Sequence, residues 1–219
     1  MCWNEDVSLN TFLFSSFILL LIIYNNQYTK YKIEIMNNIW AYLLIASIIS
    51  VQLVEFFIWR NLKNNFYNTL FTIALIINIG LQPIISLMLL TKIKLRNTLV
   101  FLYFCVAAPT LIYNLSMTDV HTSVSKNGNL TWRNLIKPND TQYWITSICW
   151  LFFFTFSFFY EKMWIAIAYS FITLAIICYN YYNYKSEASM WCWIANSLMI
   201  CFAFYLLFVL PFYEKANIC

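Results

Sequence analysis

The feature that most constrains this chain is a series of apolar blocks, each about as long as a membrane span and separated from the next by a polar joint. The blocks occupy residues 7–24, 39–59, 66–90, 99–113, 144–160, 163–182 and 190–212. Backbone groups inside a bilayer have no water to bind, so a block of this length must form a helix. The sequence therefore predicts an all-α, integral membrane bundle of seven transmembrane helices in a single domain, residues 1–219. Six helices is the alternative, because the blocks at 7–24 and 99–113 are short.

The charge content of the chain fits the same class of protein. Only 10% of the residues are charged, whereas a soluble domain carries about a quarter. The 13 Lys and Arg residues outnumber the 9 Asp and Glu residues, but they are spread along the chain. No basic patch forms, so no nucleic-acid partner is expected. The expected partner is the lipid bilayer, and a small polar ligand is a further candidate.

The orientation of the bundle is predicted from its longest polar segment, residues 114–142. This loop contains three N-glycosylation acceptor patterns, at Asn114, Asn129 and Asn139. Glycans are attached on the lumenal or extracellular side, and seven spans then place the N-terminus outside and the C-terminus inside. Most basic residues fall in the joints that this orientation puts inside, as the positive-inside rule requires. These residues are Lys30, Lys32, Lys92, Lys94, Arg96, Lys162 and Lys215.

The second block carries polar side chains at membrane depth. Gln52, Glu55 and Trp59 follow steps of three and four, which place them on one helical face. An acid at this depth is costly and usually faces the bundle interior or a water-filled cavity. Two interpretations stay open: an outward-facing polar cavity with Glu55 as its charged member, or a structural contact in which Glu55 bonds a neighbouring helix or reaches the interface.

Other polar residues are expected at the same depth as Glu55. On the last block, Ser189, Trp193 and Asn196 share one face and lie in its outer half. The candidate ligand-binding residues are therefore Gln52, Glu55, Asn78, Trp193 and Asn196, together with Cys2 and Asn4 from the N-terminal segment. For Asn78 and Asn196 the alternative is an amide that joins two helices.

The cysteines and the histidine point to no metal site, cofactor or catalytic set. The chain has one histidine, His121, and no C-x-x-C motif, so neither a zinc site nor a Ser-His-Asp triad is predicted. A retinal Schiff base needs a buried lysine, and the last block has none before Lys215. Cys2 has three interpretations: acylation, a disulfide with Cys192 on the same side, or an N-terminal nucleophile, for which no base is in place.

Three short stretches carry a resemblance to a known family. MCWNEDVSLNTFLFSSF, VQLVEFFIWRNL and SMWCWIANSL resemble an uncharacterised family of polytopic, about seven-span membrane proteins of giant DNA viruses and microbial eukaryotes. Its members open with Met-Cys-Trp, carry Gln-x-x-Glu in the second span and have Trp-Cys-Trp in the last. The resemblance implies a membrane protein of a virion envelope or of a host endomembrane or plasma membrane. It implies no activity.

A second resemblance concerns architecture alone. Seven spans with the N-terminus outside and a divergent fourth helix resemble the three-plus-one-plus-three arrangement of sugar transporters and cargo receptors. Spans one, two, five and six contain no proline, which departs from that group. Three functions follow as hypotheses: a bundle that binds or translocates a small solute, a non-enzymatic organiser of a membrane, and, least favoured, a lipid-modifying enzyme.

Overall fold

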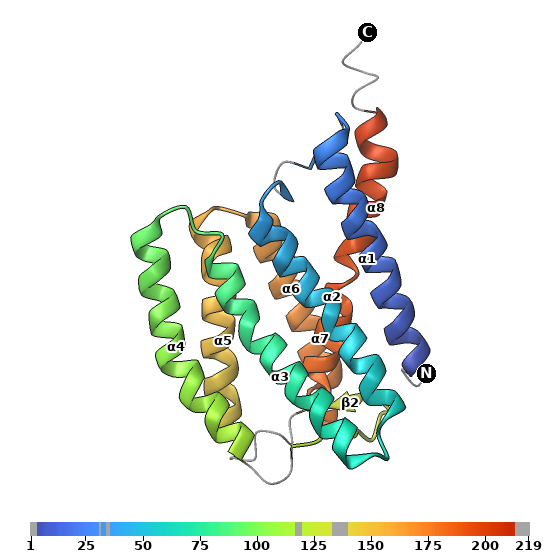
Figure 1. Cartoon of the computed structure of the whole chain (residues 1–219), viewed down its shortest axis with the longest axis vertical. Helices are drawn as coiled ribbons and strands as arrows, with labels where there is room; N and C mark the ends of the chain where they lie inside the picture. The colour runs from blue at the N-terminus through green and yellow to red at the C-terminus, as the bar shows by residue number, and fades with distance from the viewer. Residues whose placement is uncertain (1–3, 31, 34–35, 117–119, 133–139, 213–219) are drawn as a thin grey trace.

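The computed structural model describes residues 4–30, 32–33, 36–116, 120–132 and 140–212 (Figure 1). In this part of the chain, seven helices are long and apolar enough to cross a membrane. This confirms the predicted all-α bundle of seven spans. Helices of this kind are compatible with a multi-pass integral membrane protein in a lipid bilayer.

Six of the spans are single helices. They are α1 (Glu5–Tyr28), α2 (Ile39–Arg60), α3 (Asn65–Leu87), α4 (Ile93–Ser116), α5 (Asp140–Tyr160) and α6 (Trp164–Tyr181), the last followed by a 3₁₀ turn, Tyr182–Tyr184. The seventh span, Glu187–Phe212, consists of α7 (Glu187–Ala195), α8 (Leu198–Phe204) and a π-helical turn, Tyr205–Val209. The described residues also include a short antiparallel hairpin of β1 (Ser123–Val124) and β2 (Leu130–Thr131).

Local sequence explains where several helices begin. Asn4, Asn38 and Asn64 accept hydrogen bonds from backbone N–H groups in the first turns of α1, α2 and α3, which otherwise have no helical partner. Helix α4 begins at Ile93, whereas the hydropathy pattern placed its start at residue 99. Its basic first turn can be helical because exposed side chains such as Lys94 extend into water at the end of the bundle. The two blocks that looked short are therefore full spans.

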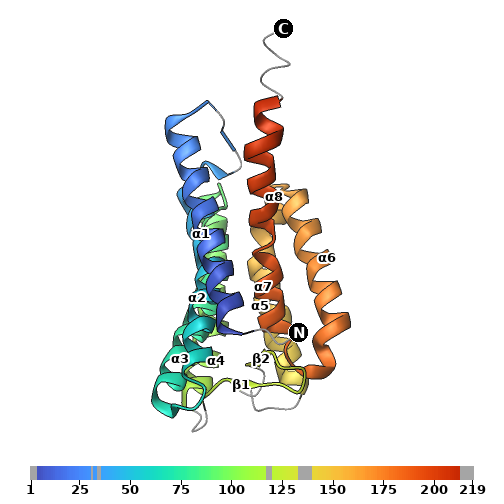
Figure 2. The ribbon, with the colours of Figure 1, turned by 90° about the vertical axis from the view of Figure 1, so that its right-hand side faces the viewer.

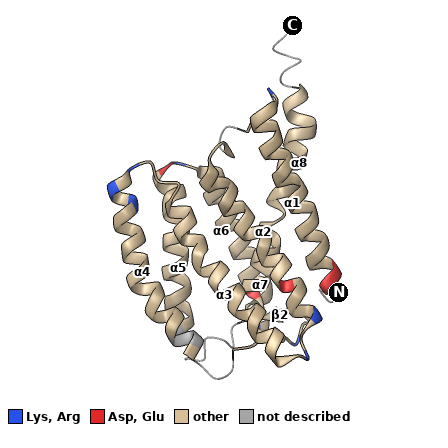
Figure 3. Ribbon diagram, in the orientation of Figure 1, with Lys and Arg blue, Asp and Glu red and all other residues tan. Residues whose placement is uncertain are grey.

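The helices run roughly along one direction, so the bundle has two distinct ends (Figure 1). The start of α1, the end of α2, the start of α7 and the β hairpin lie together at what we call the hairpin end. The seventh span finishes at the opposite end. Turned by 90°, the bundle shows α1, α2 and α3 on one side and α6, α7 and α8 on the other (Figure 2). Lys and Arg are drawn at the ends of the bundle and not along its middle (Figure 3).

Small polar side chains join helices inside the bundle. The Asn78 amide on α3 donates to the Ser47 carbonyl and to the Ser50 hydroxyl on α2, each at 3.0 Å. The Ser86 hydroxyl on α3 lies 2.7 Å from that of Ser157 on α5. Because lipid chains are as apolar as the helices themselves, such contacts help to decide which helices pair.

Pro83 leaves a gap in the hydrogen bonding of α3 that other helices fill. A proline has no N–H, so the carbonyl four residues earlier, that of Ile79, loses its helical donor. The Trp150 indole N–H on α5 donates to this carbonyl at 2.9 Å. The Tyr103 hydroxyl on α4 donates to the next carbonyl, that of Gly80, at 2.8 Å. The Trp150 side chain thus satisfies a carbonyl that the bilayer would leave unpaired, and the Tyr103 hydroxyl adds a contact between α4 and α3.

The outer faces of the bundle are apolar and aromatic. Phe101 on α4 and Ile165 and Tyr179 on α6 are among many large apolar side chains exposed on the isolated chain. Exposure on this scale is unusual for a soluble monomer. In a bilayer these side chains contact lipid, so the structure suggests a lipid environment.

Candidate functional site

The most unusual group of the structure is the carboxyl of Glu55, which is buried where α2 meets α7. Only 3% of the Glu55 surface is exposed, and Gln52, one turn earlier, is fully buried. The Gln52 amide N–H donates to Oε2 of Glu55 at 2.9 Å. The Ser189 hydroxyl, in the first turns of α7, donates to Oε1 at 2.5 Å. The polar face of α2 thus points into the bundle, as its spacing indicated.

A small cavity adjoins this carboxyl, and we call it the Glu55 pocket. Side chains of α1, α2, β2 and α7 line it: Ser8, Gln52, Glu55, Trp59, Leu130, Ser189, Met190 and Trp193. Its volume is about 10 Å³, which is room for about one water molecule. Oε1 of Gln52 is buried there and has no hydrogen-bond partner among the described residues.

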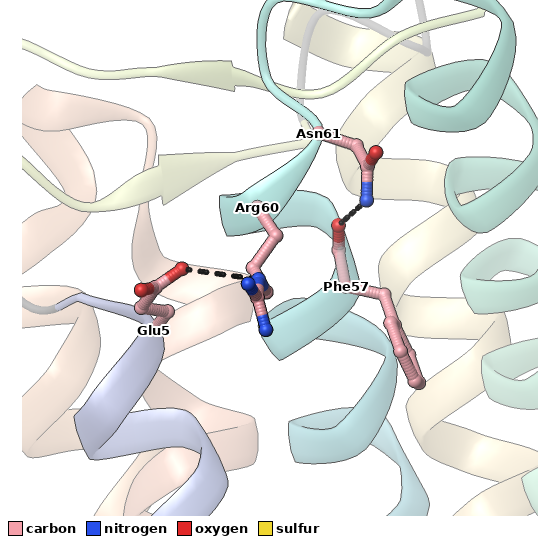
Figure 4. Close-up of polar contacts among 4 residues, drawn as sticks. All are labelled: Glu5, Phe57, Arg60 and Asn61. Atoms are coloured by element: carbon pink, nitrogen blue, oxygen red, sulfur yellow. Dashed lines mark hydrogen bonds and ion pairs between the residues drawn. The ribbon is translucent and has the colours of Figure 1, made fainter.

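Contacts around the pocket tie α1 to its neighbours. The Trp193 indole N–H on α7 donates to the Thr11 hydroxyl on α1 at 3.1 Å. Glu5 at the start of α1 pairs with Arg60 at the end of α2 at 3.9 Å (Figure 4). Both charged side chains are about half exposed, so this pair contributes at most about 1 kcal/mol. Within the described part of the chain, Glu55 has no ion pair with Lys or Arg.

The hairpin contributes one wall residue to the pocket. Leu130 of β2 lines the pocket, is 1% exposed and packs in one apolar cluster with Val51 and Ile58 of α2 and Leu75 of α3. Trp132, just after β2, belongs to the same cluster. The segment 120–132 was expected to be part of a hydrophilic loop, but its apolar side chains Val120, Leu130 and Trp132 are part of the core.

Hydrogen bonds fix the hairpin segment to α3. The Asn68 side chain pairs with the backbone of Thr122 in both directions, donating to its carbonyl at 3.0 Å and accepting from its N–H at 2.9 Å. The hydroxyls of Thr72 and Thr122 lie 2.9 Å apart. All three residues are buried. Because backbone groups of the segment are paired with a side chain of α3, the segment is docked on the bundle in a defined position.

The other side of the hairpin is attached to the joint between α6 and α7. The Thr131 hydroxyl donates to the Lys185 carbonyl at 2.5 Å, and the Asn127 amide donates to the Ser186 hydroxyl at 3.1 Å. The hairpin therefore bridges the two sides of the bundle at this end.

Sequence reasoning missed a second buried acid, Glu187. It begins α7, is 5% exposed and accepts a hydrogen bond from the Tyr143 hydroxyl on α5 at 2.8 Å. The available signal was Ser186-Glu187 ahead of an apolar run, a common pattern at the start of a helix. The acid lies two residues before Ser189, on the helix that also supplies the donor to Glu55. Ser8 and Leu130 of the pocket were likewise not predicted.

The structure brings together three of the predicted ligand-binding residues: Gln52, Glu55 and Trp193. Asn196 and Ser189 were both expected at the depth of Glu55, and the hydrogen-bond partner on the seventh span is Ser189. Asn196 follows the last residue of α7, about two turns further along, and its amide donates to the Cys192 carbonyl of the preceding turn.

The remaining predicted residues lie away from the Glu55 pocket or outside the described residues. Asn78 joins α3 to α2, and Asn4 is exposed and caps α1. Cys192 is a free thiol, while Cys2 is outside the described residues, so the disulfide between them stays a prediction.

The predicted glycosylation sites also stay predictions. Asn129 lies in the hairpin segment and is 3% exposed, Asn114 lies near the end of α4, and Asn139 is outside the described residues. A glycan on Asn129 has to be attached before the hairpin packs, because the folded segment leaves its amide no access.

The chemistry of the pocket rests on oxygen atoms. Among the described residues, no three His, Cys, Asp or Glu side chains gather into a group that could hold a metal ion. The residues that line the pocket supply one carboxyl, one amide and two hydroxyls. The carboxyl of Glu55 is the acid among them, and its hydrogen-bond donors, Gln52 and Ser189, are neutral. Comparison of the chain with protein-family models, with curated proteins and with solved structures finds no match.

Proposed function

We propose that this multi-pass membrane protein binds a small polar solute at the Glu55 pocket and moves it across its membrane. The observation that carries the proposal is a buried acid beside a small cavity that Gln52 also lines, with the buried Oε1 of Gln52 unpaired among the described residues. Ionisable groups inside membrane bundles commonly mark solute and ion pathways. Leu130 of the hairpin lines this site, and in this proposal the structure corresponds to a closed state.

The broken seventh span supports a moving part next to the site. Helix α7 ends at Ala195 and α8 begins at Leu198, and a π-helical turn follows from Tyr205. Asn196 lies at the break, where its Oδ1 is buried without a partner among the described residues. Transporters commonly place discontinuous helices beside their substrate site. The sequence did not indicate this break, because neither Gly nor Pro occurs at it.

The orientation and the membrane form part of the proposal. With the N-terminus outside, the hairpin end faces the lumen or the extracellular space, and the Glu55 pocket lies toward that side. The basic residues of the opposite end favour this orientation. The family resemblance favours a virion envelope or a host endomembrane or plasma membrane.

The test compares two conservative variants of the full chain in proteoliposomes. Uptake of radiolabelled sodium, rubidium, glycine and glucose is measured for the wild type, for Glu55→Gln and for the control Glu161→Gln. Glu161 lies at the opposite end of the bundle, where it accepts hydrogen bonds from Thr91 that a glutamine oxygen can also accept. We expect the wild type to take up one of these solutes. Glu55→Gln should lose this uptake, and Glu161→Gln should retain it. Uptake that is equal in all three proteins, or absent from all three, contradicts the proposal.

The second candidate function is a non-enzymatic organiser of a membrane. Two observations favour it: both carboxyl oxygens of Glu55 already have protein donors, and the cavity holds only about one water molecule. On this view Glu55 holds α2 to α7, and Glu55→Gln behaves like the wild type in every uptake assay. No observation among the described residues favours the lipid-modifying enzyme.

A further inference from the structure

The charge of Glu55 has no counterpart in the described part of the protein. Its donors, the Gln52 amide and the Ser189 hydroxyl, are both neutral. The nearby Arg60 side chain is mostly exposed and pairs with Glu5 instead. An isolated carboxylate taken out of water is strongly unfavourable unless a positive charge accompanies it. The described residues supply no such charge, so within this part of the protein a proton or a bound cation has to neutralise the carboxylate.

The atoms around the pocket indicate which kind of cation fits. Four of its lining residues carry side-chain oxygens, Glu55, Gln52, Ser8 and Ser189, and Oε1 of Gln52 has no partner among the described residues. The indole N–H of Trp193 is directed to Thr11 instead. Hard cations prefer carboxylate and carbonyl oxygens, whereas soft metals prefer sulfur and imidazole. A single carboxylate balances one positive charge, so a divalent ion would leave an uncompensated charge in the bundle.

The size of the pocket restricts the cation further. A cavity of about 10 Å³ admits one particle about as large as a water molecule. A hydrated ion or an organic cation does not fit, but a bare sodium or lithium ion does. We infer that the Glu55 pocket binds one dehydrated monovalent cation, held by the Glu55 carboxylate and the Oε1 of Gln52. This inference deepens the proposed function and rests on the same site, but it requires binding only.

The experiment measures thermal unfolding of the purified full chain in detergent at mildly alkaline pH. Sodium, lithium or potassium chloride replaces choline chloride at constant ionic strength. We expect the Tm to rise by several degrees with sodium and lithium and to keep rising with the logarithm of their concentration, with a smaller rise for potassium. A ligand that binds only the folded state stabilises it in this way once its concentration exceeds its Kd. Glu55→Gln abolishes the dependence on the cation, and Glu161→Gln retains it.

A second variant removes the whole amide of Gln52, both Oε1 and the Nε2 that donates to Glu55. Gln52→Met keeps the length of the side chain, so a given rise in Tm above the choline value should need at least about tenfold more sodium. If Gln52→Met is less stable in choline, the rise measured from its own Tm in choline still reports binding. An unchanged sodium requirement in Gln52→Met contradicts the role given to this oxygen.

Other outcomes overturn the inference. If the Tm does not change with any of the three cations but changes with pH in the wild type and not in Glu55→Gln, the carboxylate is neutralised by a proton. If the Tm changes with neither cation nor pH, Glu55 is a neutral carboxyl beside a water molecule. The result is also separable from the proposed function. If sodium stabilises the protein but no solute is taken up, transport is refuted and the cation site stands. If another solute is taken up in a Glu55-dependent way but sodium does not stabilise the protein, the cation site is refuted and transport stands.

Discussion

At the scale of single residues, Glu55 shows how one acid is accommodated inside a membrane bundle. One of its hydrogen bonds comes from its own helix and the other from α7. The first follows from a spacing of three residues, and the second depends on how the two helices meet. Changes at this position therefore separate the role of charge from the role of hydrogen bonding.

The first prediction compares two substitutions of Glu55 in choline chloride at mildly acidic pH, where a proton can neutralise the carboxyl in place of a small cation. Glu55→Gln retains an oxygen that accepts one of the two hydrogen bonds, so its free energy of unfolding should stay close to that of the wild type. Glu55→Leu leaves the Gln52 amide and the Ser189 hydroxyl unpaired in a buried site and should destabilise the protein by about 1–3 kcal/mol. Unfolding in mixed micelles with increasing denaturing detergent measures this, with Asn61→Ala, an exposed side chain that bonds its own helix, as the control. A Glu55→Leu protein as stable as the wild type contradicts the structural contacts.

The second prediction concerns the carbonyl that Pro83 leaves free. Trp150→Phe removes the N–H that donates to Ile79 and should cost about 1–2 kcal/mol of unfolding free energy. The control is Trp164→Phe, which alters an exposed tryptophan and should change stability by less than about 0.5 kcal/mol.

A double-mutant cycle tests the mechanism of this effect. Pro83→Ala restores a backbone N–H that can donate to Ile79 within α3, so Trp150→Phe should cost less in that background. If Trp150→Phe lowers the free energy of unfolding by the same amount in the wild type and in Pro83→Ala, Trp150 acts through packing alone.

At the scale of elements, the hairpin segment 120–132 behaves as a cover docked on the bundle. Its attachment combines apolar packing of Leu130 and Trp132 with hydrogen bonds from Asn68 and Thr72. Because backbone groups of Thr122 are paired inside the bundle, loss of the partner side chain leaves them unpaired in a buried place.

The third prediction follows from this attachment. Asn68→Ala removes both contacts to the Thr122 backbone and should destabilise the docked hairpin by about 1–3 kcal/mol. Hydrogen exchange of residues 120–132, followed by mass spectrometry, should accelerate while exchange in α5 and α6 stays unchanged. The control is Asn61→Ala at the same end, whose amide donates only to the Phe57 carbonyl of its own helix (Figure 4). Exchange that does not respond to Asn68→Ala argues against docking through this residue.

At the scale of the whole molecule, seven spans place the hairpin and the finish of the seventh span at opposite ends (Figure 1). The structure fixes this relation between the two ends, and the direction of the bundle in the membrane remains the prediction drawn from the basic residues and the acceptor asparagines. The hairpin end is expected outside.

The fourth prediction tests this direction. The protein made in a eukaryotic cell should carry glycosidase-sensitive mass that disappears when Asn114, Asn129 and Asn139 are all changed to Gln. Because Asn129 is buried in the folded hairpin, the single change Asn129→Gln should remove less of this mass than changes at the other two positions. Labelling of Cys219 by an impermeant reagent on intact cells would place the C-terminus outside and contradict the orientation.

The sequence by itself determined the number and type of spans and the inward face of α2. Both depend on local properties, because an apolar block in lipid has to satisfy its own backbone, and a spacing of three or four residues fixes a helical face. It also indicated Gln52, Glu55 and Trp193 as members of one site.

Only the tertiary structure decided the partner of Glu55, the docking of the hairpin and the break in the seventh span. Ser189 and Asn196 were both polar candidates on the seventh span, and the way α7 meets α2 selected Ser189. Thr122 and Asn68 are 54 residues apart, so no local pattern could pair them. Apolar helices have little preference among themselves in lipid, and their pairing is set by close packing and by a few hydrogen bonds that form only when the whole bundle is assembled.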